Sequence, residues 1–253
     1  MKETQNTQIA RERLRKLTSK PVAITTLAEE AKRINAPYIK DFLGSTIEEN
    51  DRVVIALNSD KPETQEAIFI HEVTHQIIKH SGFPNIDYDL DYANAFISKD
   101  HIPLLLQLMG YLVSSLEHPE VYRQMTEFYD LDMKKYFEDL MVQKMRRFSL
   151  PTPSHKIDII LGEQQDIVEG IEYHYYHPSV KPKIQEELER VSPNAYRIVE
   201  EYFNELPNGW YRRPLDCERT AKLIISRVIE FGESNDLGFA NHLWRAIRVI
   251  MPS

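Results

Sequence analysis

The sequence predicts a mostly α-helical protein with a small β-sheet, an α+β fold. Only eight of the 253 residues are glycine, and Leu, Glu, Lys, Arg and Ile recur at helical spacing through most of the chain. Two short segments near the N-terminus are instead rich in β-branched and aromatic residues. Charged residues at 28% and hydrophobic residues at 42% are ordinary globular usage, so the chain is expected to fold into a compact core with two lobes.

The N-terminal segment is predicted to begin with two helices. Residues 8–18 have helical periodicity, and so do residues 24–34, where Thr25 or Thr26 is a suitable N-cap and acidic residues follow in the first turns. The two helices are interrupted near Pro21.

Two strands and a long helix are predicted next. Residues 36–45 and 51–60 are expected to be strands, because they are rich in aromatic and β-branched residues and are bounded by turn formers. The segment 59–84 starts with Ser and Asp, has a proline near its first turn and ends with Gly82 and Pro84. These signals delimit a helix of about five turns.

Downstream, the pattern predicts further helices and one irregular segment. Residues 85–97 are acidic and aromatic without a clear period, which indicates a loop or a lid. Residues 102–116 are apolar almost all round, which predicts a helix buried on every side that is too short to span a membrane. More helices are expected at residues 130–147, 179–190, 193–205, 215–231 and 236–249.

Two prolines, Pro151 and Pro153, mark the expected joint between two parts of the chain. The division predicts an N-terminal core at residues 1–150 and an all-helical C-terminal lobe at residues 151–253.

The composition excludes several classes of protein. A net charge of −8 argues against a protein whose main partner is nucleic acid or an anionic membrane. The single cysteine, Cys217, forms no internal disulfide and no thiolate metal cluster. The first residues have no apolar leader, and no stretch approaches about 18 apolar residues. We therefore expect a cytoplasmic protein with neither a membrane nor a nucleic-acid partner.

The stretch EAIFIHEVTHQIIKH, residues 66–80, carries the strongest chemical signal. His71 and His75 are four residues apart, so on a helix both imidazoles lie on one face and can bind one zinc ion. Glu72 follows the first histidine, about 100° round the helix, and suits the role of general base toward a water molecule at that ion. The alternative is a core helix whose histidines have structural hydrogen bonds.

The segment IFIHEVTHQII, preceded by the predicted strand RVVIALN and two helices, resembles the zincin metallopeptidases over residues 20–125. The resemblance implies a zinc-dependent hydrolase of peptide bonds, with a peptide or protein substrate and a small sheet over the active-site helix. It also implies that an exposed edge strand binds the substrate in extended form.

A catalytic zinc site usually has three protein ligands, so one more is expected. The histidine and glycine that a metzincin-like continuation needs are absent from the required positions. The gluzincin-like alternative takes a glutamate from a downstream helix, and Glu117, at the end of the apolar helix, is the preferred candidate. Glu120, His118 and Asp91 remain alternatives.

Other interpretations stay open at this point. The chain can be an inactive or latent regulatory protein on a zincin scaffold, with segment 85–97 binding a partner, or a zinc hydrolase of a non-peptide amide. His174 and His177, in EYHYYHP, can stabilise an oxyanion, or can belong to an aromatic packing seam.

Overall fold

The computed structural model describes residues 3–35, 43–60, 62–150, 153, 155–235 and 238–252. Most of these residues are helical, which confirms the predicted class. The chain divides into two compact units. Unit 1 comprises Met1–Ser81 and Val121–Gln143, and unit 2 comprises Gly82–Glu120 and Lys144–Ser253. The expected single boundary at residue 150 is therefore replaced by a division in which each unit is built from two segments of the chain.

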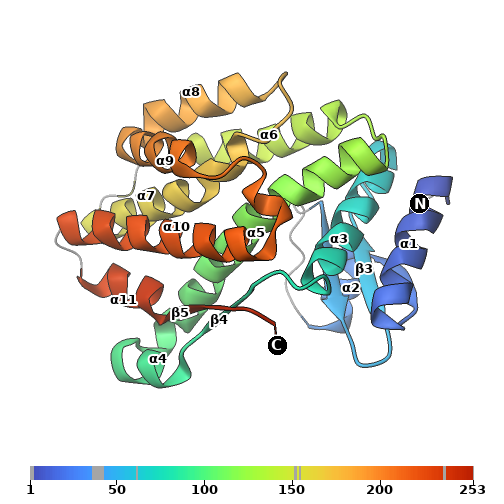
Figure 1. Ribbon diagram of the computed structural model, residues 1–253, viewed down its shortest axis with the longest axis horizontal. Helices are drawn as coiled ribbons and strands as arrows, with labels where there is room; N and C mark the ends of the chain where they lie inside the picture. The colour runs from blue at the N-terminus through green and yellow to red at the C-terminus, as the bar shows by residue number, and fades with distance from the viewer. Residues whose placement is uncertain are drawn as a thin grey trace. The chain divides into compact units, whose positions relative to one another are not determined.

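Unit 1 contains a three-stranded sheet with helices packed against it (Figure 1). The strand order is β1-β3-β2, with β1 parallel and β2 antiparallel to the central β3. Helix α3 contacts α1, β2 and β3. The elements are α1 (Gln5–Thr18), β1 (Val22–Thr26), α2 (Leu27–Arg33), β2 (Gly44–Glu48), β3 (Val53–Leu57), the 3₁₀ turn η1 (Pro62–Thr64) and α3 (Gln65–Lys79).

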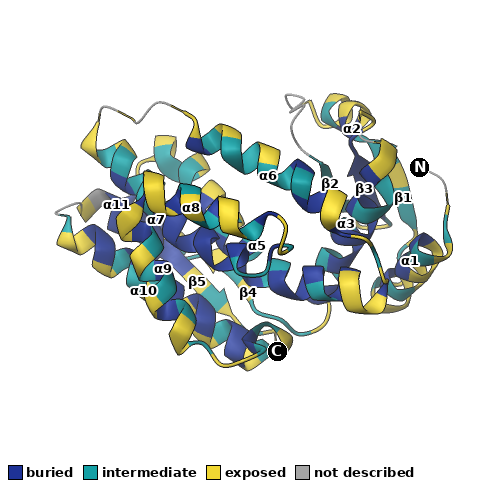
Figure 2. Ribbon diagram, turned by 90° about the horizontal axis from the view of Figure 1, so that it is seen from above, coloured by how far each residue is buried: buried dark blue, intermediate teal, exposed yellow. Residues whose placement is uncertain are grey.

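The central strand β3 is the best predicted element of this sheet. All five of its residues, VVIAL, are buried, as Figure 2 shows in dark blue. A continuous apolar run is what a strand paired on both sides and covered by a helix requires. The strand predicted at residues 36–45 falls largely outside the described residues, and β2 begins at Gly44.

The prediction of a helix over residues 24–34 was wrong in its first turn. Residues 22–26 form β1, and the helix begins only at Leu27. Thr26 is the last residue of the strand and also the predicted N-cap: its hydroxyl accepts from the Glu29 N–H, while the Glu29 carboxylate accepts from the Thr26 N–H. Thr25 and Thr26 are β-branched and suit a strand, and Thr26 also caps the helix that follows. Parallel pairing with β3 places both residues in the strand.

Strand β2 approaches helix α3 so closely that only glycine fits at one position. A Cβ atom added at Gly44 would lie 2.6 Å from Ile68 Cγ2 and 3.1 Å from Glu72 Cγ. The first of these distances is well inside van der Waals contact, so one of the two elements must shift to accept any side chain.

Replacing Gly44 with alanine is therefore expected to destabilise unit 1 by about 1–3 kcal/mol, the usual cost of overpacking. Urea unfolding followed by circular dichroism measures the change. Trp fluorescence is unsuitable, because both tryptophans, Trp210 and Trp244, lie in unit 2. The matched control is Gly110→Ala in α5 (Ile102–Arg123), where an added Cβ meets nothing within 4 Å. This substitution is expected to be neutral or stabilising. Equal stability of Gly44→Ala and the wild type would contradict the tight packing of β2 on α3.

Unit 2 is a helical assembly with a two-stranded sheet. Its apolar core is contributed mainly by α5, α7, α9, α10 and α11. The elements are β4 (Asn85–Tyr88), α4 (Leu90–Phe96), the 3₁₀ turn η2 (Lys99–His101), α5 (Ile102–Arg123), α6 (Lys134–Phe148), α7 (Lys156–Tyr173), α8 (Lys181–Val191), α9 (Pro193–Glu205), the 3₁₀ turn η4 (Trp210–Arg212), α10 (Pro214–Ser234), α11 (Gly238–Ala246) and β5 (Ile247–Ile250). Helices α5 and α6 each contribute residues to both units.

Two expectations for segment 85–97 and the C-terminal lobe were wrong, and one helix of this part of the chain was missed. Segment 85–97 is not an irregular loop, because it forms β4 and α4. The C-terminal lobe is not all helical, because β5 pairs antiparallel with β4. Helix α7 was not predicted at all, although it is among the longest helices described.

Helix α5 is not buried on every side. Leu105, Leu108, Leu112 and Leu116 form one buried stripe at helical spacing, whereas Leu106 is 50% exposed. The helix also continues past Pro119 to Arg123, where a π-helical turn, η3 (Gln124–Phe128), follows. Within the described part of the chain, no helix combines the length and the apolar character that crossing a membrane requires.

Candidate metal centre

Helix α3 presents the predicted histidine pair from a well-anchored position. Its apolar residues, among them Ile68, Phe69 and Val73, are buried against the rest of unit 1. His71 is itself buried, at 7% exposure, and His75 lies one turn further along the helix and is half-buried. The spacing of four residues therefore places both imidazoles on one face, as predicted.

The two imidazoles direct the same kind of atom at one another. Nε2 of His75 lies 3.0 Å from Nε2 of His71, and the rings meet edge to face at 73°. Two nitrogen ligands on one tetrahedral zinc ion, each about 2.0–2.1 Å from the metal, are about 3.3 Å apart. The pair is therefore spaced much as two ligands of one ion are.

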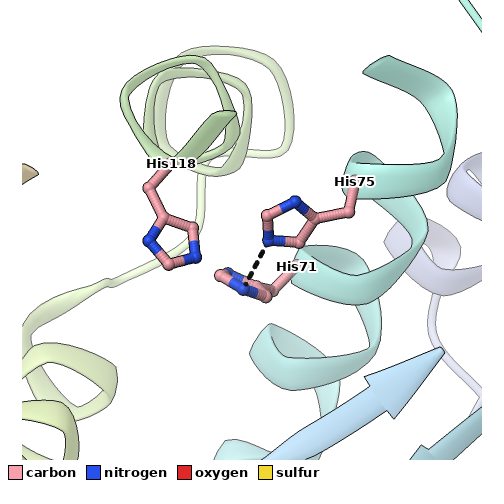
Figure 3. A group of neighbouring side chains, drawn as sticks. All are labelled: His71, His75 and His118. Carbon is pink, nitrogen blue, oxygen red and sulfur yellow. Dashed lines mark hydrogen bonds between the residues drawn. The ribbon is translucent and has the colours of Figure 1, made fainter. Parts of the chain in front are cut away.

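His118 joins this pair. Among the side chains that the structure describes, His71, His75 and His118 form the one group of His, Cys, Asp or Glu whose ligand atoms gather closely enough to hold an ion, all within 4.8 Å of one another. Figure 3 shows His118 projecting from a second helix toward the two histidines of α3.

The continuity of α5 explains why His118 reaches this position. Tyr122 follows His118 by one helical turn, and its ring lies 6.1 Å from that of His71. Residues i and i+4 share a helix face, so the same helix that brings Tyr122 to His71 brings His118 to the pair.

The preferred candidate for the third ligand, Glu117, is not part of this group. Consecutive residues of a helix point about 100° apart, so Glu117 and His118 do not face the same ion. Glu117 lies instead near the buried thiol of Cys217 on α10: burial raises the pKa of Cys217 to about 12, and the charge of Glu117 adds to the rise. Of the remaining alternatives, Glu120 is buried and Asp91 is exposed on α4, and neither joins the three histidines.

Hydrogen bonds outside the group fix which nitrogen faces inward. Nδ1 of His71 lies 2.9 Å from the hydroxyl oxygen of Tyr136 on α6. Nδ1 of His118 is hydrogen-bonded to a carboxylate oxygen of Glu172 on α7. In both rings the outer nitrogen is thus engaged and Nε2 is directed to the centre, which is the pattern that metal-binding histidines show.

Glu72 is held by strand β2. The Thr46 hydroxyl donates to Glu72 Oε2 over 2.8 Å, and Gly44 of the same strand leaves room for the Glu72 side chain. The carboxylate predicted as general base is therefore oriented by the edge strand of the sheet, from the position next to His71 on α3.

A group of buried charged side chains in unit 2 contacts His118 through Glu172. Burial opposes the ionisation of Glu172, but its interactions with His118 and Lys144 outweigh it and lower the pKa of Glu172 to about 2. Burial likewise disfavours the ammonium form of Lys144, yet the neighbouring Glu169 and Glu172 raise its pKa above the ordinary value. Both groups are therefore charged at neutral pH.

The candidate oxyanion donors are not members of the three-histidine group. The His174 ring stacks on Phe203 of α9 with centroids 3.7 Å apart, and its Nε2 is 3.1 Å from Glu200. His177 Nδ1 is 2.7 Å from the Ser179 hydroxyl, two residues along the chain. The structure therefore places His174 in an aromatic packing seam of unit 2, the alternative that the sequence left open, whereas His177 forms a local hydrogen bond at the surface.

The sequence reasoning missed Tyr136, Glu172 and Lys144. A signal for Glu172 was present: Asp166, Glu169 and Glu172 recur at every third residue with only apolar residues and a glycine between them, and acids so placed need cationic partners. Tyr136 had no such signal.

Comparison with protein-family models, curated proteins and solved structures gives no match. The assignment of the site therefore depends on its own chemistry. Three gathered imidazoles, two of them with a hydrogen-bonded Nδ1, are a donor set that fits a zinc ion, because catalytic zinc sites commonly use three nitrogen or oxygen ligands from the protein.

Proposed function

We propose that the protein is a zinc-dependent hydrolase of peptide bonds, with His71, His75 and His118 as the metal ligands and Glu72 as the general base. The observation that carries the proposal is the gathering of the three imidazoles on α3 and α5, with a carboxylate at the position next to His71. When bound, zinc supplies a Lewis acid that acidifies water and polarises a carbonyl group. His118 replaces Glu117 in the ligand set, for the geometric reason given above.

The chain's own residues account for the remaining requirements of the reaction. A carboxylate oxygen of Glu72 accepts a proton from the attacking water and later delivers it to the leaving amine. The Thr46 hydroxyl keeps the carboxylate in one orientation through its bond to Oε2. Tyr136 and Glu172 keep Nε2 of His71 and of His118 directed at the ion.

An extended peptide is the substrate class that the sheet favours. Within the described residues, β2 is an edge strand, paired on one side with β3. The same strand carries Thr46, which contacts Glu72. A peptide added to β2 by strand pairing would thus run beside the general base.

Hydrolysis of a mixed pool of peptides tests the proposal. We expect cleavage by the purified protein, its loss after removal of metal with a chelator, and its return when zinc is added. Mass spectrometry of the products identifies the bonds that are cut. Zinc-dependent release of an amine from simple non-peptide amides without peptide cleavage would favour the amide hydrolase instead. No zinc-dependent hydrolysis of either class would leave the regulatory scaffold as the better account.

A further inference from the structure

A buried set of ionic side chains in unit 2 ends at His118. Helix α7 contributes Asp166, Glu169 and Glu172, all nearly inaccessible, and helix α6 contributes Lys144 and Arg147. Lys144 Nζ lies 3.0 Å from Glu169 and 3.4 Å from Glu172. Arg147 pairs with both Asp166 and Glu169. Because residues three apart share a helix face, the acidic residues lie on one face of α7 and the basic residues on one face of α6, where they can pair.

The set contains three carboxylates and two cationic side chains. Burying an unbalanced charge is costly, so the third carboxylate needs a further positive partner. The two carboxylates at the far end, Asp166 and Glu169, share Arg147, and Asp166 also accepts from the Ser192 hydroxyl. Glu172 stands at the other end, where Lys144 is its more distant contact and His118 its closest.

Glu172 meets His118 at Nδ1, the nitrogen opposite the one that belongs to the metal group. A carboxylate at Nδ1 holds the N–H there, leaves the lone pair on Nε2 and makes the imidazole a stronger ligand. Glu172 itself is 2% exposed and is held by Lys144, so the orientation it imposes on the ring is fixed.

We propose that Glu172, held by Lys144, is the positioning residue that selects the metal-binding tautomer of His118. The negative charge of Glu172 would also balance the charge of a metal ion bound by that ring. This inference rests on the proposed zinc site. It assigns to helix α7 a part in metal binding, through a carboxylate located 54 residues after His118 in the sequence.

The test compares the zinc affinity of Glu172→Gln with that of the wild type, by competition with a chromophoric chelator. We expect the affinity to fall about 10–100-fold, the usual effect of losing an orienting partner. The matched control is Glu169→Gln, which removes the same charge one turn earlier on α7. The Glu169 carboxylate contacts Lys144, Arg147, Gln165 and Tyr173. The Glu169→Gln substitution is expected to change zinc affinity by less than about threefold.

The outcomes separate this inference from the proposed function. A wild type that binds no zinc overturns both. A wild type that binds zinc, with Glu172→Gln unchanged or with both variants weakened equally, overturns only the positioning role of Glu172.

A second measurement does not depend on how well the variant folds. In metal-free wild-type protein, ¹⁵N NMR of the histidine rings is expected to show His118 with its proton on Nδ1, assigned by comparison with His118→Asn. An unprotonated Nδ1, with the ring proton on Nε2, would overturn the inference even if zinc binding were intact.

Discussion

Replacing Glu72 with glutamine is expected to lower kcat/KM for peptide hydrolysis by about 10²–10⁴-fold, the contribution that a positioned general base makes. Glutamine keeps the shape of the side chain and an oxygen that accepts from Thr46, but it takes up no proton. Because the proposed ligands are the three histidines and do not include Glu72, zinc binding should be retained. Steady-state kinetics together with zinc content measures both effects.

The matched control for this variant is Glu66→Gln, which makes the same change in the first turn of α3. Glu66 accepts a hydrogen bond from Thr4 and is six residues before Glu72. Its replacement is expected to leave kcat/KM within a few-fold of the wild-type value. Full activity of Glu72→Gln would rule out Glu72 as the base, whereas loss of zinc would show that Glu72 acts on the metal site itself.

Replacing His118 with alanine is expected to lower zinc affinity by more than about 100-fold, because it removes a ligand and not merely a group that orients one. The neighbouring variant Glu117→Ala is expected to bind zinc as the wild type does. The pair discriminates sharply, since the two residues are adjacent on α5 but diverge by about 100° around the helix axis. Chelator competition measures both affinities.

The opposite result has an equally definite meaning. Zinc affinity lost in Glu117→Ala and retained in His118→Ala would restore the glutamate expected from the gluzincin-like pattern. It would also require a rotation of α5 from the arrangement in which Tyr122 lies beside His71 and Glu117 beside Cys217.

The histidine pair and the helix that carries it were predictable from the sequence, because both depend on local spacing. His71 and His75 share a face whatever the rest of the chain does, and a Ser/Asp start with a Gly/Pro stop delimits the helix. Strand β3 was likewise predictable, since five consecutive buried apolar residues satisfy a strand with neighbours on both sides.

The third histidine of the group was not predictable with the same certainty. Glu117 and His118 are adjacent, so the choice depends on the rotation of α5 about its axis. That rotation is set by the packing of its leucine stripe and by the continuation of the helix past Pro119. Proline is unfavourable inside a helix, and the sequence therefore indicated an end where the structure has none.

Long-range pairing accounts for the other errors. Residues 22–26 have a composition that suits a helix start or a strand, and the choice follows from parallel pairing with β3, about 30 residues away. Strand β5 forms because β4, far earlier in the chain, pairs with it. The bond between Glu172 and His118 joins α7 to α5 in the same way, and no local period reveals it.

The zinc content of the wild-type protein tests the central claim most directly. The purified protein would be offered zinc, dialysed against metal-free buffer and measured by elemental analysis. The proposed three-histidine site predicts about one zinc per chain after dialysis, because three imidazoles would hold the ion. A zinc content near zero in folded protein would contradict the metal centre, and with it the proposed hydrolase.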